Sequence, residues 1–181
     1  MSGLTDLNAT YSFDPAHTQL GFVVRHAMVT NVRGTFGDVA GTAVLIGSDP
    51  DASSVEVTMQ VASVDTGSEG RDDHLRSADF FDVETYPTIH FASTAVKLVD
   101  ATHVDITGDL TIKDTTRQIT LPMEFTGAAT DPFGNERVGF EGEVKVSRKD
   151  YGLTWNAAME TGGMLVADTV KLTFEVSAIR A

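Results

Sequence analysis

The feature that most constrains this chain is an alternation of apolar and polar residues with a period of two, which recurs in eight segments. It is clearest over residues 54–61, where apolar side chains occupy every second position from Val55 to Val61. Such alternation predicts β-strands with one buried and one exposed face. The expected strands are residues 19–26, 32–46, 54–61, 88–96, 103–112, 117–125, 137–147 and 169–179.

Eight strands joined mostly by short turns favour an all-β fold, an antiparallel barrel, over a sandwich, because closure removes exposed strand edges. A barrel of this size either fills itself with side chains or holds one small ligand. The inward residues are mostly of medium size and the chain has 1 Trp, which favours a cavity. Gly34, Gly37 and Gly41 suit bends or bulges. Residues 1–10 are expected to be a flexible leader, and residues 11–181 a single domain.

Two segments interrupt the strand pattern. A helix is expected over residues 68–79, since Thr66 and Glu69 have capping-box spacing and Asp72 with Arg76 forms an i,i+4 pair. A second short helix is expected over residues 149–160, which carry Leu153 and Trp155. One or two short helices in an otherwise all-β chain predict a lid or plug at the mouth of the barrel.

Composition excludes several kinds of partner and site. The net charge of −13 argues against nucleic acid and against adsorption to anionic membranes, both of which require a basic surface. The chain has no cysteine, so disulfides, thiol catalysis and cysteine metal sites are excluded. The N-terminus lacks the features of a signal peptide, and no apolar run approaches the roughly 18 residues of a transmembrane helix. We therefore expect a cytoplasmic protein without stable membrane insertion.

Familiar catalytic and metal-binding patterns are not found in the sequence. The 5 histidines lack metal-ligand spacing, no serine lies in a nucleophile elbow, and no glycine pair matches a phosphate-binding loop. His26 shares a strand face with Phe22 and Val24. It is therefore either a core histidine at the barrel rim or a contact for a ligand head group.

The remaining candidate residues each allow two interpretations. Charged residues of the first expected helix either form a solvated face with weak ion pairs or orient a ligand at the barrel mouth. These charged candidates are Arg71, Asp72, His74 and Arg76. Apolar candidates are either ordinary core or the lining of an elongated pocket. They are Phe22, Val24, Phe36, Val57, Met59, Phe80, Phe81, Phe91, Leu110, Phe125, Phe140, Trp155 and Phe174.

Several motifs together resemble the YceI-like family. They are residues 11–22 (YSFDPAHTQLGF), 32–36 (VRGTF), 74–77 (HLRS), 79–82 (DFFD), 108–112 (GDLTI) and 146–153 (VSRKDYGL). The similarity runs in register over residues 11–179. The chain departs from the family at Tyr11, where Trp is commoner, at Tyr151, where Phe is commoner, and at Asp114, where a turn glycine is usual.

The resemblance implies an extended eight-stranded, lipocalin-like barrel and non-enzymatic binding of a long amphiphilic lipid. The lipid classes implied are polyisoprenoids, isoprenoid quinones and fatty amides, bound without any other cofactor. Transport or storage of that lipid, an association with stress responses and a homodimer are also implied. Many relatives are periplasmic. An apolar tail in a dry channel gains about 0.8 kcal/mol per buried methylene, so about ten methylenes supply enough gross energy for micromolar affinity.

Two other functions stay open on the sequence alone. The first is an enzyme that acts on a small apolar substrate, which requires His26 and the Arg71–Arg76 cluster to converge within hydrogen-bond reach inside one pocket. The second is a packed barrel that serves as an interaction module, which requires a filled interior.

Overall fold

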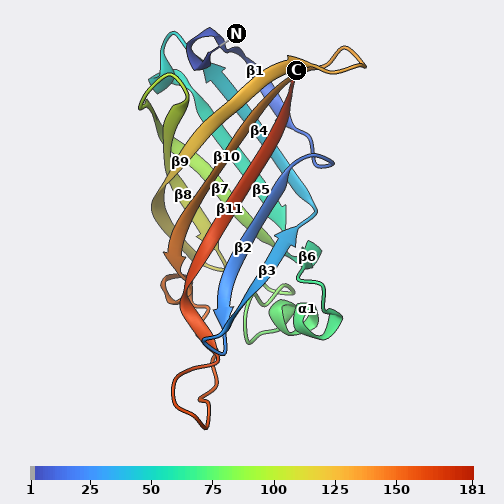
Figure 1. Ribbon diagram of the computed structural model, residues 1–181, viewed down its shortest axis with the longest axis vertical. Helices are drawn as coiled ribbons and strands as arrows, with labels where there is room; N and C mark the ends of the chain where they lie inside the picture. The colour runs from blue at the N-terminus through green and yellow to red at the C-terminus, as the bar shows by residue number, and fades with distance from the viewer. Residues whose placement is uncertain (1–2) are drawn as a thin grey trace.

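The computed structural model describes residues 3–181, which form a barrel with the two termini at one end and a short helix across the other (Figure 1). The strands are β1 (Asn8–Phe13), β2 (Gln19–His26), β3 (Thr30–Phe36), β4 (Val39–Ile46), β5 (Ser54–Gln60), β6 (Val64–Asp65), β7 (Thr88–Leu98), β8 (His103–Ile112), β9 (Thr115–Thr130), β10 (Glu136–Ser147) and β11 (Val166–Arg180). The helices are α1 (Glu69–Arg76) and the 3-10 helices η1 (Leu4–Asp6), η2 (Pro50–Ala52), η3 (Val61–Ser63) and η4 (Arg148–Tyr151).

Eight strands close the barrel in the order β1-β4-β5-β7-β8-β9-β10-β11, and the pairing of β1 with β11 completes the ring. Every pairing is antiparallel, which confirms the predicted architecture. Strand β2 continues the line of β1 along β11 after a loop at residues 14–18. Strand β3 likewise leads into β4 after a break at Gly37 and Asp38, within the segment predicted as one long strand.

Most of the segment expected to be a leader forms regular structure in the residues that the structure describes. Residues 4–6 form η1, β1 begins at Asn8, and Leu7 is buried in the barrel. Residues 1 and 2 of that predicted leader lie outside the described residues. Strand β1 is essential to the architecture, because its pairing with both β4 and β11 closes the ring.

Two glycines serve a purpose that differs from the predicted bend. A Cβ atom at Gly34 would lie 2.3 Å from the ring of Phe22, its cross-strand partner, and one at Gly41 would lie 2.5 Å from the ring of Phe13. Both rings therefore lie flat against the backbone of the neighbouring strand. Gly108 gives the same room to the ring of Phe91. Rings held against the wall occupy less of the lumen, and this arrangement helps to keep the barrel from filling itself.

The first helix forms, but its ends and ion pairs differ from expectation. Helix α1 spans Glu69–Arg76, and Ser68 is its N-cap, with the Ser68 hydroxyl accepting from the backbone N–H of Arg71. The predicted capping box from Thr66 is therefore wrong. Thr66 instead donates to the buried carboxylate of Asp72 from its backbone N–H (2.9 Å) and its hydroxyl (2.5 Å).

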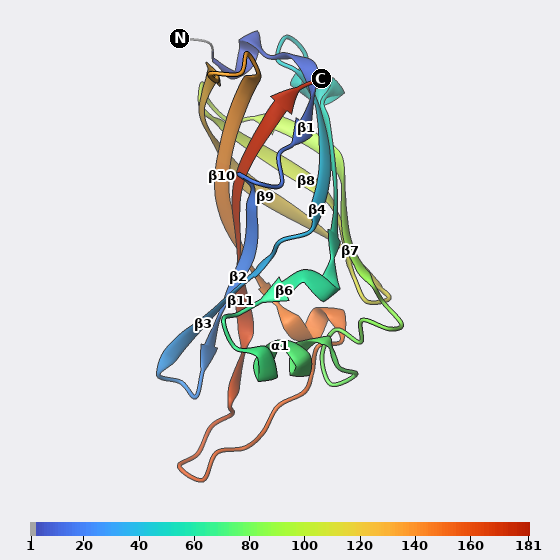
Figure 2. The same cartoon turned by 90° about the vertical axis from the view of Figure 1, so that its right-hand side faces the viewer.

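Arg76 does not form its predicted pair with Asp72. Its guanidinium contacts Asp73 at 3.0 Å and donates to the backbone carbonyls of Ala62 (3.0 Å) and Val64 (3.1 Å). These two hydrogen bonds tie α1 to the segment that holds η3 and β6. Figure 2 shows the result, with α1 lying below the end of the barrel opposite the termini.

The predicted second helix over residues 149–160 does not form. The chain makes only the single turn η4, which ends at Gly152 in the left-handed region (φ 75°). The buried guanidinium of Arg148 then takes the carbonyls of Leu153 (2.6 Å) and Trp155 (2.8 Å) as hydrogen-bond acceptors. Carbonyls held in this way are not available to a continuing helix, so residues 152–165 form a loop.

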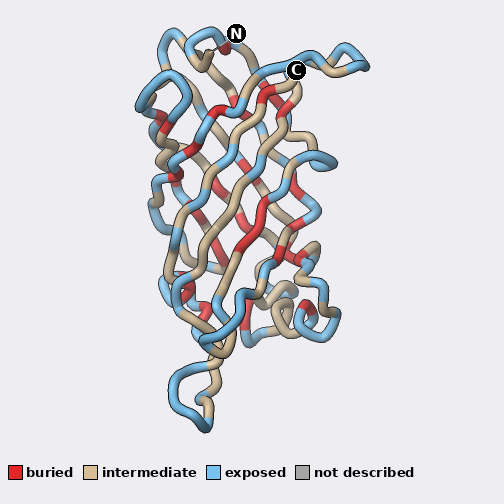
Figure 3. Tube along the Cα trace, viewed as in Figure 1, coloured by how far each residue is buried: buried red, intermediate tan, exposed pale blue. Residues whose placement is uncertain are grey.

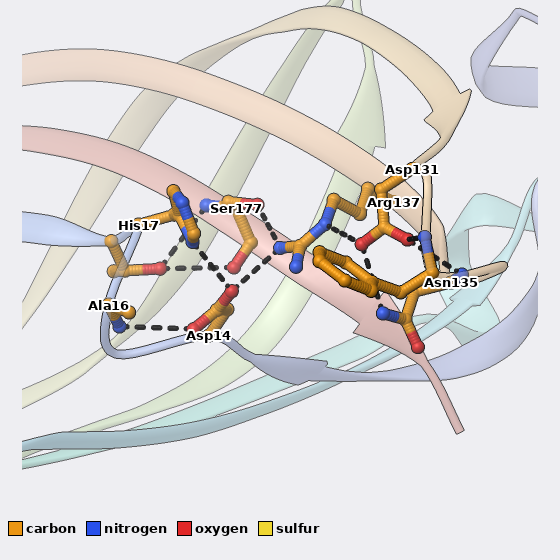
Figure 4. Close-up of polar contacts among 9 residues, drawn as sticks. Asp14, Ala16, His17, Asp131, Asn135, Arg137 and Ser177 are labelled. Carbon is orange, nitrogen blue, oxygen red and sulfur yellow. Dashed lines mark hydrogen bonds and ion pairs between the residues drawn. The ribbon is translucent and has the colours of Figure 1, made fainter.

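Ionic contacts join the β1–β2 loop to the β9–β10 hairpin near the terminal end of the barrel (Figure 4). The guanidinium of Arg137 donates to the carboxylates of Asp14 (2.7 Å) and Asp131 (2.7 Å). Both carboxylates are largely buried. Hydrogen bonds from Arg137 and His17 lower the pKa of Asp14 to about 2. The charged form of Asp14 is therefore the one that the folded protein stabilises.

We expect Asp14→Asn to lower the free energy of unfolding at pH 7 by about 1.5–3 kcal/mol, the usual contribution of a hydrogen bond to a charged group. The pKa of Asp14 is about 2 in the folded protein and about 3.9 in an unfolded chain, so this stabilisation is present above about pH 4 and is lost as the pH falls towards 2. Urea unfolding at several pH values should therefore show the variant and the parent converging in acid. Glu175→Gln, at an exposed carboxylate on β11, is the control and should show no comparable loss at pH 7.

Candidate functional site

The interior of the barrel holds a cavity of about 360 Å³ with an almost wholly apolar lining. Side chains from every strand of the closed ring reach it, together with residues of β2, β3 and α1 and of the segments that follow α1 and η4. Figure 3 shows the corresponding pattern, in which buried residues alternate with exposed ones along the barrel wall. The interior is therefore not filled by side chains, contrary to the requirement of the interaction-module hypothesis.

Most of the predicted site residues line this cavity. They are Phe22, Val24, His26, Phe36, Val57, Met59, Arg71, His74, Phe80, Phe81, Phe91, Leu110, Phe140, Trp155 and Phe174. Their convergence follows from the period-two pattern, since alternate residues of each strand point to the same side of the wall. The structure places these residues around one space, and their contact with a ligand stays a prediction.

Three predicted residues do not line the cavity. Asp72 and Arg76 are occupied in holding α1 to the chain around it. Phe125 lies at the terminal end of the barrel, where its ring packs against Phe140 with centroids 5.4 Å apart. It belongs to a separate buried cluster with Leu7, Tyr11, Val138 and Ala178. That cluster and η1 cover the terminal end of the barrel.

The basic groups of the lining lie at the α1 end. They are Arg25, His26, Arg71, His74 and Arg148. At the terminal end the corresponding polar group is the hydroxyl of Ser53, whose oxygen accepts from the backbone N–H of Ile46. The cavity therefore has a polar end beside α1 and an apolar end beside the termini.

Aromatic contacts hold α1, with the segments next to it, across the end of the barrel, and we refer to this part of the molecule as the lid. The His74 ring packs edge-on against Trp155 (centroids 4.6 Å apart) and Phe80 (5.0 Å), and its Nε2 atom is 2.9 Å from a carboxylate oxygen of Asp79. This cluster joins α1 to the loop that follows η4. The guanidinium of Arg71 is occupied as well, because it donates to the hydroxyl and the carbonyl of Thr66 at 2.7 Å each.

These contacts bear on the enzyme hypothesis. Arg71, Asp72, His74 and Arg76 each hydrogen-bond to α1 or to the segments next to it, and among residues 3–181 no hydrogen bond joins two side chains of the set that this hypothesis requires, which also includes His26. Among residues 3–181, no group of three or more His, Asp or Glu side chains is arranged to hold a metal ion. Within the same residues, no helix has the length and hydropathy needed to cross a bilayer.

Sequence reasoning missed Arg148 as a site residue. Its buried guanidinium lines the cavity and donates to the carbonyls of Val166 (3.3 Å) and Ala167 (2.9 Å), in addition to the two loop carbonyls. Burial lowers the pKa of Arg148, and the carboxylate of Asp168 opposes that effect from 3.6 Å. Its position in the 146–153 motif was the available signal, but strand periodicity says nothing about side chains in turns.

Tyr151 is the second missed residue. It lines the cavity and is only 2% exposed, and its hydroxyl is the buried side-chain group found without a hydrogen-bond partner among residues 3–181. Burial raises the pKa of Tyr151, so the hydroxyl stays protonated at neutral pH. Compared with the commoner Phe, Tyr151 therefore adds a buried hydroxyl, and no hydrogen bond to that hydroxyl is found among residues 3–181.

We expect Tyr151→Phe to raise the free energy of unfolding of the ligand-free protein by up to about 1–3 kcal/mol, the cost of burying an unpaired polar group. The ring and its packing are kept, so chemical denaturation isolates the effect of the hydroxyl. Tyr86→Phe, at a half-buried tyrosine outside the lining, is the control and should change stability little. A loss of stability in Tyr151→Phe would show that the hydroxyl has a partner, such as an enclosed water.

Comparison with known proteins agrees with this geometry. A family model described as the YceI-like domain matches residues 11–178. The protein YceI of Escherichia coli O157:H7 is 41% identical over 147 residues, covering 80% of this chain and 76% of that protein. The structure of Burkholderia cenocepacia BcnA superposes with a TM-score of 0.80 at 24% identity, over 91% of this chain and 98% of that one. A polyisoprenoid binding domain from Saccharophagus degradans gives a TM-score of 0.73 at 16% identity, over 96% and 100% of the two chains.

Proposed function

Since this chain belongs to the YceI-like family, we propose that it binds one long amphiphilic lipid, with the apolar tail inside the barrel and without chemical change to the lipid. The lipid classes that fit are polyisoprenoids, isoprenoid quinones and fatty amides. The polyisoprenoid binding domain of Saccharophagus degradans, which shares the fold, supports the isoprenoid classes. Transport or storage of the bound lipid is the function that this binding serves.

The observation that carries the proposal is the apolar cavity of about 360 Å³ inside the ring of strands. This volume lies within the range of about 300–1,000 Å³ that is usual for small-molecule sites. Each methylene transferred from water to such a lining gains about 0.8 kcal/mol, so a tail supplies its affinity through length. Affinity of this kind selects ligands by shape, and polar contacts add the remaining selectivity.

The polarity of the cavity orients the proposed ligand. The ionisable lining residues at the α1 end suit the head group, and the aliphatic lining towards the termini suits the tail. Most of the polar groups at the α1 end already hold the lid or the loop, including the five N–H groups of Arg148 that face four carbonyls and Asp168. The His26 imidazole has no hydrogen bond to another residue among residues 3–181, and it is the group best placed to meet a head group.

Native mass spectrometry tests the proposal directly. We expect the protein to take up one molecule of a long-tailed isoprenoid quinone or a polyprenol, with a mass shift equal to that lipid. Recovery of bare protein alone after incubation with both lipids would contradict the proposal. A mass shift that differs from the mass of the added lipid would show that the protein had modified the lipid chemically, and would instead favour the enzyme hypothesis.

A bulky residue in the lumen should block the lipid. Val57 on β5 lines the cavity, so Val57→Trp is expected to weaken isoprenoid binding by more than about tenfold, because the added rings occupy the space of several methylenes. Thr58→Trp, at the next residue, places the same side chain on the outer face and should leave affinity unchanged. Thermal unfolding of both variants verifies the fold, since overpacking alone costs about 1–3 kcal/mol. Equal affinity of Val57→Trp and Thr58→Trp would show that the lipid binds elsewhere.

A further inference from the structure

Three large apolar side chains are exposed together at the α1 end of the molecule. Met28 is 65% exposed, Val29 is 69% exposed, and Met164 is 49% exposed. Met28 and Val29 lie in the turn between β2 and β3, and Met164 lies in the loop that precedes β11. We refer to these three residues as the apolar tip. In Figures 1 and 2 the loop of Met164 projects furthest beyond the barrel on the side away from the termini.

The apolar tip is held in place by its own contacts. The backbone N–H of Ala27 donates to the carbonyl of Leu165 at 2.7 Å, which joins the turn to the loop. Gly163 lies against the sulfur of Met28, since a Cβ atom there would be 2.5 Å from it. Ala27 and Met28 also adopt left-handed backbone conformations (φ 51° and 62°), which are unfavourable for residues other than glycine. The chain thus accepts backbone strain at the point where it exposes a large apolar side chain.

The apolar tip is continuous with the polar end of the cavity. His26 directly precedes the β2–β3 turn and lines the cavity, and Leu165 and Val166 follow Met164 and line it as well. A surface that contacts the apolar tip therefore lies next to the polar end of the cavity, which we take as the entrance for a lipid. Among residues 3–181, the other exposed large apolar residues are Val99 and Phe133, which lie in turns at the terminal end, away from this entrance.

The two segments that carry the apolar tip differ in charge from the chain as a whole. Residues 25–33 and 156–168 carry two positive side chains, Arg25 and Arg33, and two negative ones, Glu160 and Asp168. The balance there is neutral, whereas the chain as a whole carries −13. This neutral, convex and apolar point fits an uncharged membrane interface better than an anionic one. It is also small for a second copy of the chain, because a stable protein interface needs roughly 20–30 residues from each partner.

We propose that the apolar tip docks the barrel onto the interface of a zwitterionic lipid bilayer, so that lipid passes directly between the membrane and the cavity. This proposal rests on the proposed function, because it concerns how the bound lipid is loaded. Met28, Val29 and Met164 enter the interface, and the entrance beside His26 comes to lie against the bilayer. The barrel stays outside the hydrocarbon core, and contact is reversible because only three large side chains take part.

The experiment compares two routes of loading. The full chain is mixed with phosphatidylcholine vesicles that contain a long-tailed isoprenoid quinone, and the rate at which quinone moves to the protein is measured after flotation of the vesicles. In parallel, equilibrium affinity is measured with the same quinone supplied from detergent micelles. The test variant is Met28→Ser with Val29→Ser and Met164→Ser. The matched control is Val99→Ser with Phe133→Ser, which removes exposed apolar surface from the opposite end.

We expect the test variant to load from vesicles at least roughly tenfold more slowly than the parent, because three apolar side chains no longer enter the interface. Its affinity for quinone from micelles should stay within about twofold of the parent, and the control should match the parent in both measurements. Equal rates of loading from vesicles for the test variant and the control would overturn the proposal. A parent protein that loads from micelles but not from phosphatidylcholine vesicles would also overturn it, and would favour a protein partner. A parent that binds no quinone from micelles would contradict the proposed function itself, and the docking proposal with it.

Discussion

The backbone pairing of β1 with β11 is the constraint on which the rest of this structure depends. It closes a ring of eight strands, and a closed ring has a diameter set by strand number and stagger. The wall is therefore held by hydrogen bonds between strands, and the lumen does not have to be filled for the wall to persist. Glycines opposite Phe22 and Phe13 then let large rings lie along the wall, so that burial of aromatic surface and an open interior coexist.

The sequence predicted the barrel well because a barrel wall follows a local rule. Alternation placed Phe22, Phe91 and Phe174 on the inner face, and the structure confirms that they surround one space. Strand β1 was missed because residues 8–13 mix small, polar and aromatic side chains without a clear apolar stripe. Its assignment depends on pairing with β4 and β11, which is a tertiary property that local pattern does not carry.

The candidate site was less predictable where side chains act across the chain. The expected pairing of Asp72 with Arg76 is wrong because each has stronger partners outside the helix, namely Thr66 and the carbonyls of residues 62 and 64. The helix expected over residues 149–160 is absent because Arg148 captures its carbonyls. The energetic cost of burying the Tyr151 hydroxyl was likewise not predictable, because it depends on which atoms of the folded chain enclose that group. The homodimer and the cytoplasmic location stay predictions.

The uneven polarity of the cavity has a consequence for the path of a cargo molecule. If the head group rests beside α1, then the tail must thread into the barrel ahead of it. In a bilayer, however, the tail is the part buried deepest and the head faces the water. A molecule that moves between the bilayer and the barrel must therefore reverse its direction relative to the protein, and its tail must fold back on itself as it leaves the leaflet. The energetic barrier to exchange then lies in exposing the bend of that folded chain, and a longer tail slows departure as well as strengthening retention.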